Sequence, residues 1–217
     1  MPKILSADEA VKVIPDGATV AVNSSSGLNC PDAVLKALGE RFDREQHPRN
    51  LSMIHPIAAG DMFGIRGVEN VAKPGMIARI IGGSYPSGPS TSEPPQIWQM
   101  ITANEIPAYN VPSGIMFDIL REAAAKRPGV ITKVGLETFV DPDNEGCAMN
   151  ARAAAAPIVK KIRFEGDDWL FFPAIVPDVA IIRGSVCDER GNISFEQEGA
   201  YLGALDVAMA AHNNGGI

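Results

Sequence analysis

Short apolar runs alternate with longer amphipathic stretches along the first half of the chain. The runs have the length of buried strands, and the stretches repeat their apolar positions with the spacing of a helix. This alternation is typical of the α/β class, in which an open and mostly parallel sheet is flanked by helices. The predicted strands are residues 18–23, 51–55, 76–81 and 106–110, and the predicted helices are residues 32–46, 96–103 and 115–126.

The second half of the chain has a different pattern. Residues 158–164 and 169–172 flank the turn signal Glu165–Asp168, which predicts an antiparallel hairpin. The basic run Lys160–Arg163 in this hairpin is compatible with phosphate contacts or, as is more common, with a half-exposed face of alternating charge. We therefore expect one α/β domain with an antiparallel hairpin as an embellishment.

Toward the carboxyl end, residues 178–186 and 193–196 predict a second strand-turn-strand unit. An apolar helical stretch over residues 200–212 then runs into Asn213–Gly216, which is a strong helix stop. Ile217 follows in the place of the first residue of a further strand. We expect the whole chain to form a single domain. We also expect the chain to be a fragment, a processed chain or one subunit of a larger unit.

Composition and charge exclude several classes of function. With 46% hydrophobic and 21% charged residues among 217, the chain is long enough to bury the core of one domain. The formal charge of −7 excludes a chain-wide basic surface, so we expect neither nucleic acid nor a membrane as a partner. The three cysteines are widely spaced, which excludes a disulfide framework and favours the reducing cytoplasm.

The amino terminus carries a helix signal and no targeting signal. Ser6 and Glu9 have the spacing of a capping box, which predicts a short helix through Ile14. The same residues lack the apolar segment of a signal peptide, and no window of the chain is as apolar as a membrane span. We therefore expect a protein that is neither exported nor membrane-spanning.

The loop Ser24–Cys30 is the first candidate for ligand binding. It follows a predicted strand and opens a predicted helix, where backbone N–H groups and the helix dipole favour anions. A phosphate or a carboxylate would suit this place, and the candidate residues are Ser26, Gly27 and Asn29. An ordinary connection built from small residues for close packing is the alternative.

A second loop, Gly83–Ser90, follows another predicted strand and nearly has the spacing of a P-loop. Pro89 stands where the phosphate-binding lysine is needed, and proline also removes a backbone donor from the cradle. Nucleotide hydrolysis is therefore not expected. Gly82 and Gly83 remain candidates for lining a substrate site, and a plain turn-rich connection is the alternative.

The other reactive side chains give little support for metal or nucleophile chemistry. Cys147 and Cys187 lack a neighbouring basic residue, so we expect inert thiols. The acidic segment 137–146 is a loop, and loop carboxylates are mostly solvated, so its spacing does not indicate a catalytic base. We expect no metal site, because the histidines lack the spacing of ligands on one helix: His47, His55 and His212.

A series of short motifs, in this order, resembles the family I CoA-transferases, in particular the acetyl/propionate and acetoacetate type. The resemblance covers essentially the whole chain, and the order and spacing of the motifs make it specific. The motifs are Gly60-Asp61, Arg66-Gly67, Ala108–Gly114, Arg121–Ala125, Pro128–Val130, Thr138–Pro142 with Asn150, Pro177–Arg183, Asp188–Asn192 with Phe195, and His212–Gly216.

This resemblance implies two related α/β domains of the CoA-transferase and sugar-phosphate isomerase type, of which this chain is the first, and a C-terminal domain or beta subunit outside it. In the family a glutamate of the second half attacks a short-chain acyl-CoA, and a glutamyl-CoA thioester then passes CoA to a carboxylic acid. Glu137 and Glu198 lack the Glu-x-Gly context of that nucleophile. Coenzyme A is then a substrate, no cofactor is needed, and a homo- or hetero-oligomer is expected.

The resemblance also assigns residues. In the family the first half supplies an oxyanion donor, usually the Gln of a Pro-Gln-Gly segment, and the matching positions are Pro112-Ser113-Gly114. Ser113 and Gly114 are therefore the oxyanion candidates, with a serine hydroxyl in place of a longer amide. The first loop carries serines where the family is usually glycine-rich, which indicates either an altered acyl or acceptor preference or a different donor. The candidates for substrate and CoA binding are Ser26, Gly27, Asn29, Gly82 and Gly83.

Two alternatives stay open. The first is a non-catalytic module on the same fold that binds acyl-CoA or a small anion and regulates, which the serine substitutions favour slightly. The second is a sugar-phosphate isomerase-like activity, which needs an Asp, His and Lys arrangement at the strand ends that the sequence does not provide.

Overall fold

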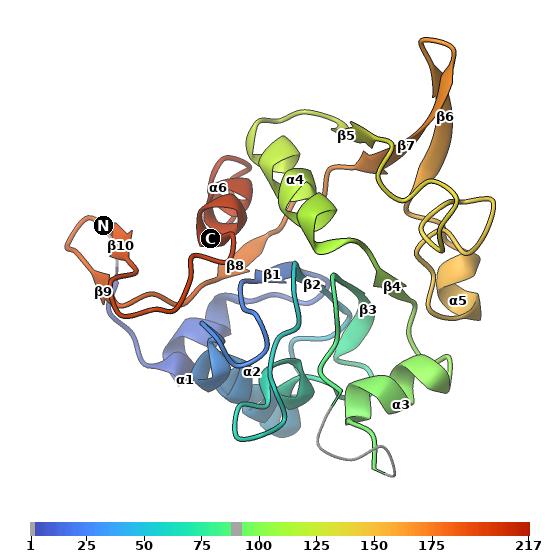
Figure 1. The fold of residues 1–217 in the computed structure, drawn as a ribbon. Coiled ribbons are helices and arrows are strands. Elements are labelled where there is room, and N and C mark those ends of the chain that lie inside the picture. The colour runs from blue at the N-terminus through green and yellow to red at the C-terminus, as the bar shows by residue number, and fades with distance from the viewer. Residues whose placement is uncertain (1–2, 88–92) are drawn as a thin grey trace.

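The structure is a computed structural model that describes residues 3–87 and 93–217. Three positions of the loop that resembles a P-loop lie outside the described residues: Gly88, Pro89 and Ser90. At its centre is a five-stranded sheet in the order β4-β3-β2-β1-β8, with every neighbouring pair parallel (Figure 1). The predicted α/β class is confirmed. The strands are β1 (Thr19–Val22), β2 (Leu51–His55), β3 (Ile77–Gly82), β4 (Ala108–Asn110) and β8 (Val179–Ile181).

The central strands separate two apolar cores. Val20 and Ala21 of β1 point into different cores, as do neighbouring residues of β2 and β3, because successive side chains of a strand face opposite sides. Both faces are therefore buried, which explains why these strands appear in the sequence as short continuous apolar runs.

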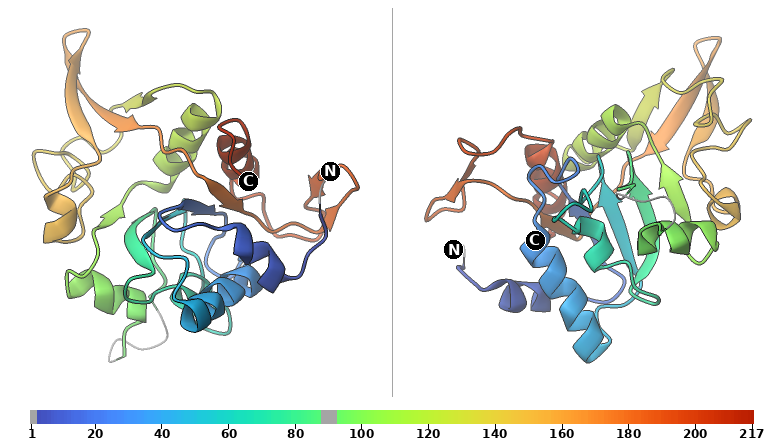
Figure 2. Two further views of the ribbon diagram at one scale, coloured as in Figure 1. Left: turned by 180° about the vertical axis from the view of Figure 1, so that it is seen from behind. Right: turned by 60° about the horizontal axis from the view of Figure 1, so that its bottom comes forward.

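Different helices cover the two faces (Figures 1 and 2). One core includes side chains of α2 (Asp32–Glu45) and α3 (Gln96–Thr102), and the other includes side chains of α4 (Ser113–Ala124) and α6 (Ala204–His212). The 3-10 helix η2 (Gly67–Asn70), which the sequence did not predict, packs along α2. A last short helix, α5 (Ala151–Ala154), lies next to β4. Among the described residues, every helix is too short or too polar to cross a lipid bilayer.

The predicted hairpin is confirmed and belongs to a second, antiparallel sheet. Its strands β5 (Gly129–Thr132), β6 (Lys160–Phe164) and β7 (Asp167–Pro173) have the order β5-β7-β6, and the β6–β7 hairpin projects from the body (Figure 1). The turn is shorter than predicted, because β7 already begins at Asp167. Glu165 and Gly166 both have positive φ, as a two-residue hairpin turn requires.

The second predicted strand-turn-strand unit is partly wrong. Residues 178–186 do not form one strand. β8 joins the parallel sheet, because the Thr19 amide donates to the Asp178 carboxylate (2.8 Å) and the Asp178 amide donates to the Thr19 carbonyl (2.9 Å). The chain then leaves the sheet, and β9 (Val186–Cys187) pairs with β10 (Ile193–Ser194) in a separate small hairpin. Periodicity alone could not reveal this division, since it depends on a contact with β1.

Both predicted signals near the chain ends are confirmed. Ser6 and Glu9 form the capping box of α1 (Ala7–Ala10), which continues as the 3-10 helix η1 (Val11–Val13). At the other end, the Ile217 amide donates to the Asp178 carbonyl (3.0 Å), and the Ala180 amide donates to the Ile217 carbonyl (2.7 Å). These are the bonds of a parallel neighbour of β8, as suits a residue that the sequence predicts to begin a strand.

Candidate functional site at the carboxyl edge of the parallel sheet

The order of the strands points to one edge of the sheet. The first four strands run outward from β1 to β4, whereas β8 lies on the other side of β1. In open α/β sheets, ligands bind outside the carboxyl ends of the strands, at the place where the order reverses. That place is the crevice between β1 and β8, and the loops that follow β2, β3 and β4 continue along the same edge.

The loop after β1 is folded into a tight turn. Ser25 and Leu28 exchange backbone hydrogen bonds of 3.0 and 2.9 Å, so Ser26 and Gly27 form the tip. Ser26 is exposed and has a φ of 53°, a conformation that favours glycine. Its amide donates to the Ala58 carbonyl (2.7 Å). The loop is therefore at the carboxyl edge, as predicted, and is fixed against the loop that follows β2.

Two buried asparagines join this loop to the segment that follows β8. Asn23 accepts a hydrogen bond from the Arg183 amide (3.2 Å) through Oδ1, and Asn29 donates to the Ala200 carbonyl (2.6 Å) through Nδ2. The remaining polar atoms, Nδ2 of Asn23 and Oδ1 of Asn29, are buried and lack a partner among the described residues. Burying such groups without a partner is costly, so these two atoms do not themselves stabilise the edge.

A cavity of about 620 Å³ lies in the crevice between β1 and β8. It is lined by Cys30, by the first turn of α2 and by residues 182–187 with Ile193. No side chain caps the amino terminus of α2, where the positive end of the helix dipole favours an anion. Burial raises the pKa of the Cys30 thiol to about 12, so this cysteine stays protonated and is not a nucleophile.

The loops after β3 and β4 bring two of the predicted residues into contact. A Cβ on Gly83 would collide with the Pro56 carbonyl oxygen and with Oγ of Ser113, so neither a side chain nor water separates these two residues. The Ala58 amide donates to Oγ of Ser84 (3.0 Å), which attaches the loop after β2 to the loop after β3. The predicted residues therefore form one continuous row along the edge.

Ser113 and Gly114 occupy the first turn of α4. The residue before them is Pro112, and no side chain caps this helix. The first-turn amides of a helix have no intrahelical partner, and they lie at the positive end of its dipole. Because Gly114 is exposed and a Cβ there would meet nothing within 4 Å, a ligand has access to this turn.

His55 is a residue of this edge that the sequence placed only at a strand end. It is fully buried, and burial lowers the pKa of its imidazole to about 4, so the ring is neutral at ordinary pH. Asn23 was likewise not predicted as a site residue. The signal that could have found both is a polar residue that ends an otherwise apolar strand.

Glu198 and the acidic segment 137–146, which the sequence singled out, make contacts of their own, whereas Asp61 lies against Gly27 at the carboxyl edge. Glu198 pairs with Nε of Arg183 (3.2 Å). In the acidic segment, the Glu137 amide holds the pKa of Asp141 below its usual value, and Lys161 lies 3.1 Å from the same carboxylate. Lys161 is thus part of an ion pair, which favours the interpretation of its basic run as a charged hairpin face. Within residues 3–87 and 93–217, no group of three or more His, Cys, Asp or Glu side chains could hold a metal ion.

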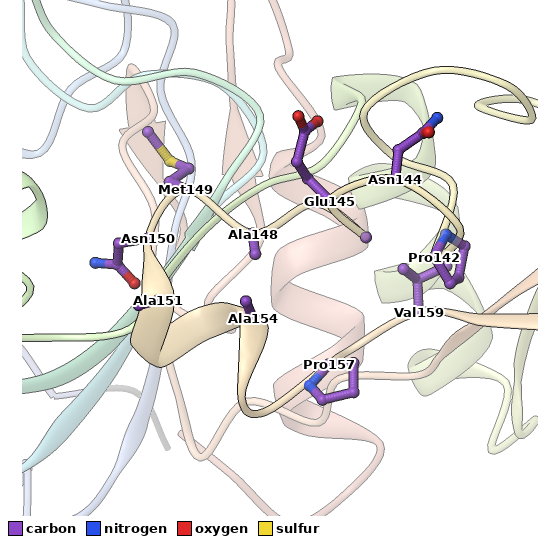
Figure 3. A pocket seen from close by; sticks show the side chains of 11 residues that line it. Pro142, Asn144, Glu145, Ala148, Met149, Asn150, Ala151, Ala154, Pro157 and Val159 are labelled. Carbon is purple, nitrogen blue, oxygen red and sulfur yellow. The ribbon is translucent and has the colours of Figure 1, made fainter.

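A second cavity, of about 590 Å³, lies away from this edge, beside α5 (Figure 3). Its polar lining side chains are those of Asn144, Glu145 and Asn150, and Asn150 is one of the residues that carry the family resemblance. The side chain is already saturated: Oδ1 accepts from the Ala153 amide, and Nδ2 donates to the carbonyls of Ile101 and Ile106. Asn150 therefore caps α5 and holds the loop before β4, so its side chain is already engaged within the fold.

Comparison with known proteins gives a consistent result. The sequence profile of the coenzyme A transferase family matches residues 4–214. The chain is 39% identical over 215 residues to the acetate CoA-transferase YdiF of Escherichia coli K12, and this match covers 99% of the chain and 39% of YdiF. It is also 39% identical over 217 residues to the caffeate CoA-transferase of Acetobacterium woodii, covering 100% of the chain and 40% of that relative.

The fold agrees with a solved relative. The acyl-CoA transferase YdiF of Escherichia coli O157:H7, in a thioester complex with CoA, superposes with a TM-score of 0.90 at 38% identity. The superposition covers 98% of this chain and 40% of the YdiF chain. The chain thus spans about two fifths of the length of the relatives that it matches.

Proposed function

Because this chain belongs to the coenzyme A transferase family, we propose that it supplies one half of the active site of an enzyme that moves CoA from a short-chain acyl-CoA to a carboxylic acid. The observation that carries the proposal is the row of serine and glycine loops at the carboxyl edge, which ends at the uncapped amino terminus of α4. This edge offers hydrogen-bond donors and space, and of its carboxylates Glu198 is bound in an ion pair and Asp61 accepts hydrogen bonds from the Phe63 and Ile65 amides.

The nucleophile is therefore a glutamate of a second half, on the same chain or on a separate subunit. Its carboxylate attacks the thioester carbonyl and the C–S bond breaks. The CoA thiolate is released, and an acyl-glutamyl anhydride is formed. The thiolate then attacks the glutamyl carbonyl, which releases the acyl group as a free carboxylate and forms the glutamyl-CoA thioester. An acceptor carboxylate then reverses both steps. It attacks the glutamyl-CoA thioester and releases the CoA thiolate, and the thiolate attacks the acceptor carbonyl of the resulting anhydride, which yields the acceptor-CoA thioester and the free glutamate. CoA is a substrate here, and no cofactor is required.

In this scheme the chain stabilises the oxyanion of the tetrahedral intermediates. The donors are the first-turn amides of Ser113 and Gly114 and the Ser113 hydroxyl, supported by the dipole of α4. Ser26, Gly27 and Gly83 have accessible surface and are the proposed contacts for substrate and CoA. Asn29 and Gly82 are buried, so their proposed role is to shape the loops that make these contacts.

The function is tested with the complete catalytic unit, by following transfer of CoA from acetyl-CoA to a second short carboxylic acid. The expected result is exchange with ping-pong kinetics, because the enzyme itself carries CoA between the two half-reactions. Binding of acyl-CoA without exchange would instead support a non-catalytic module on the same fold. The free cysteines Cys30, Cys147 and Cys187 fit the reducing cytoplasm as the proposed compartment.

The role of Ser113 has its own test. Replacing Ser113 by Ala should lower kcat of the complete unit by about tenfold or more, because the loss of an oxyanion donor weakens binding of the transition state. Thr102→Val is a matched control, since it removes the hydroxyl of an exposed residue at the carboxyl end of α3. An unchanged kcat in Ser113→Ala would show that the hydroxyl is not an oxyanion donor, and the backbone amides would remain the candidates.

A further inference from the structure

Within the part of the chain that the structure describes, the imidazole of His55 makes one hydrogen bond. His55 is the last residue of β2, and its Nδ1 lies 3.1 Å from the Ile57 carbonyl oxygen. A carbonyl oxygen only accepts, so Nδ1 carries the proton and the ring is the neutral Nδ1–H tautomer. Nε2 is buried and has no partner among the described residues.

The same ring lies between the ends of three neighbouring strands. A Cβ on Gly82, at the end of β3, would collide with Cε1 of the imidazole, so the absence of a side chain there gives the ring its space. The ring of Tyr85 packs edge-on at a centroid distance of 5.2 Å. The hydroxyl of Tyr85 donates to the Tyr109 carbonyl in β4 (2.7 Å), so one aromatic group connects the ends of β2, β3 and β4.

The residue after Ile57 is where the site loops meet. The Ala58 carbonyl accepts from the Ser26 amide (2.7 Å) and from the Ser24 hydroxyl (2.9 Å). The Ala58 amide donates to the Ser84 hydroxyl (3.0 Å). The Nδ1–H bond of His55 therefore fixes the turn to which the loops after β1 and β3 are both attached.

We propose that His55 is a positioning residue that acts through its Nδ1–H group: it holds the turn at Ile57 and Ala58, and thereby the row of loops that leads to Gly83 and Ser113. The expected effect of His55 on turnover rests on the proposed transferase function. An apolar ring would fill the same space without leaving Nε2 unpartnered, so the hydrogen bond to Ile57 is what the imidazole adds. Burial lowers the pKa of the ring to about 4, so it is uncharged at neutral pH, and the contact of Nδ1 with the Ile57 carbonyl places its one proton on Nδ1.

Two isosteric substitutions separate this role from packing. The amide nitrogen of asparagine reaches the position of Nδ1, whereas the amide of glutamine reaches the position of Nε2. His55→Asn and His55→Gln both remove the ring, and asparagine leaves the larger cavity, so a purely structural role predicts that His55→Asn is at least as damaging as His55→Gln. The positioning role predicts that kcat of the complete unit stays within about threefold for His55→Asn and falls by about tenfold or more for His55→Gln.

A second measurement does not depend on activity. Amide hydrogen exchange of Ser26 and Ala58 should be about tenfold faster in His55→Gln than in His55→Asn, because only the asparagine restores the bond that holds their turn. Equal exchange rates, or equal kcat values in an active complete unit, would overturn the inference. An inactive wild-type unit with the expected exchange difference would instead reject the transferase function and leave the positioning of the turn intact.

The wild-type protein provides a test even if both variants fail to fold. Nitrogen-15 chemical shifts of the His55 ring at pH 7 should show a protonated Nδ1 and an unprotonated Nε2. The opposite tautomer would exclude donation to the Ile57 carbonyl and would overturn the inference.

Discussion

The carboxyl edge of the parallel sheet and the antiparallel sheet of β5, β6 and β7 are stabilised in opposite ways. The described buried side-chain atoms without a hydrogen-bond partner all lie at the carboxyl edge: Nδ2 of Asn23, Oδ1 of Asn29 and Nε2 of His55. In the antiparallel sheet, by contrast, Lys133 pairs with Asp167, Arg163 pairs with Asp168, and Lys161 pairs with two aspartates. The first region leaves three buried polar atoms without a described partner, and the second pairs these basic side chains with carboxylates.

The largest expected difference between these regions concerns two glycines. Gly83→Ala should lower the free energy of unfolding by more than about 3 kcal/mol, because the new Cβ would collide with a backbone carbonyl that cannot move without distorting the loop after β2. Gly166→Ala in the hairpin turn should cost only about 1 kcal/mol, because its φ of 86° is unfavourable for alanine although the space around it is open. Urea unfolding of both variants measures the contrast, and equal losses would contradict it.

The next effect depends on pH. The pKa of His55 is lowered in the folded state from 6.5 to about 4, so between these values the unfolded chain binds a proton that the folded chain does not. Stability from this residue is complete above about pH 6.5 and falls as the pH decreases toward 4. We expect a loss of about 2 kcal/mol between pH 7 and pH 5 in the wild type, which His55→Asn should not show. Identical pH profiles of unfolding for the two proteins would show that the folded imidazole titrates normally.

A smaller effect compares two residues of positive φ. Ser26 at the carboxyl edge has a φ of 53°, and Glu165 in the hairpin turn has a φ of 50°. Replacing either by glycine should change stability by no more than about 1 kcal/mol, because relief of strain is offset by the greater freedom of the unfolded chain. Only Ser26→Gly should raise KM for acyl-CoA in the complete unit. A matching change of KM in Glu165→Gly would show that the two turns do not differ in function.

The smallest effect belongs to the antiparallel sheet alone. Lys133→Ala removes an exposed ion pair with Asp167 (2.6 Å) and a contact of Nζ with the Trp169 ring at 5.0 Å. Thermal unfolding should reveal a loss of about 0.5 kcal/mol, because exposed ion pairs contribute little, and turnover should be unchanged. A loss of activity would extend the functional region beyond the carboxyl edge.

The sequence predicts this fold well where local patterns decide it. The alternation of strands and helices, the capping box at Ser6 and Glu9, and the hairpin around Gly166 all rest on short-range chemistry. The place of β8 beside β1 was not predictable, because it depends on Asp178 meeting Thr19, a contact between distant parts of the chain. The sequence pattern therefore predicts one strand over residues 178–186, although the chain turns away from the sheet after β8.

The candidate site was predictable as a set of loops but not as an arrangement. Small residues after strands indicated the loops that contain Ser26 and Gly83, and the family resemblance added Ser113. The contact between Gly83 and Ser113, and the burial of His55 against Gly82, arise only when parallel strands bring their ends together. Burial and the hydrogen bond to Ile57 give His55 its importance, and neither is visible in a sequence where it is one of three histidines.

The central claim is that this chain forms one half of a transferase site and that the nucleophilic glutamate comes from the other half. The most direct test follows CoA transfer from acetyl-CoA to isotope-labelled propionate, first with the 217-residue chain alone and then with a second half that carries the Glu-x-Gly segment. The account predicts no transfer by the chain alone and sustained transfer when both halves are present. Robust turnover by the chain alone would contradict it, because the nucleophile would then have to lie among the residues of this chain.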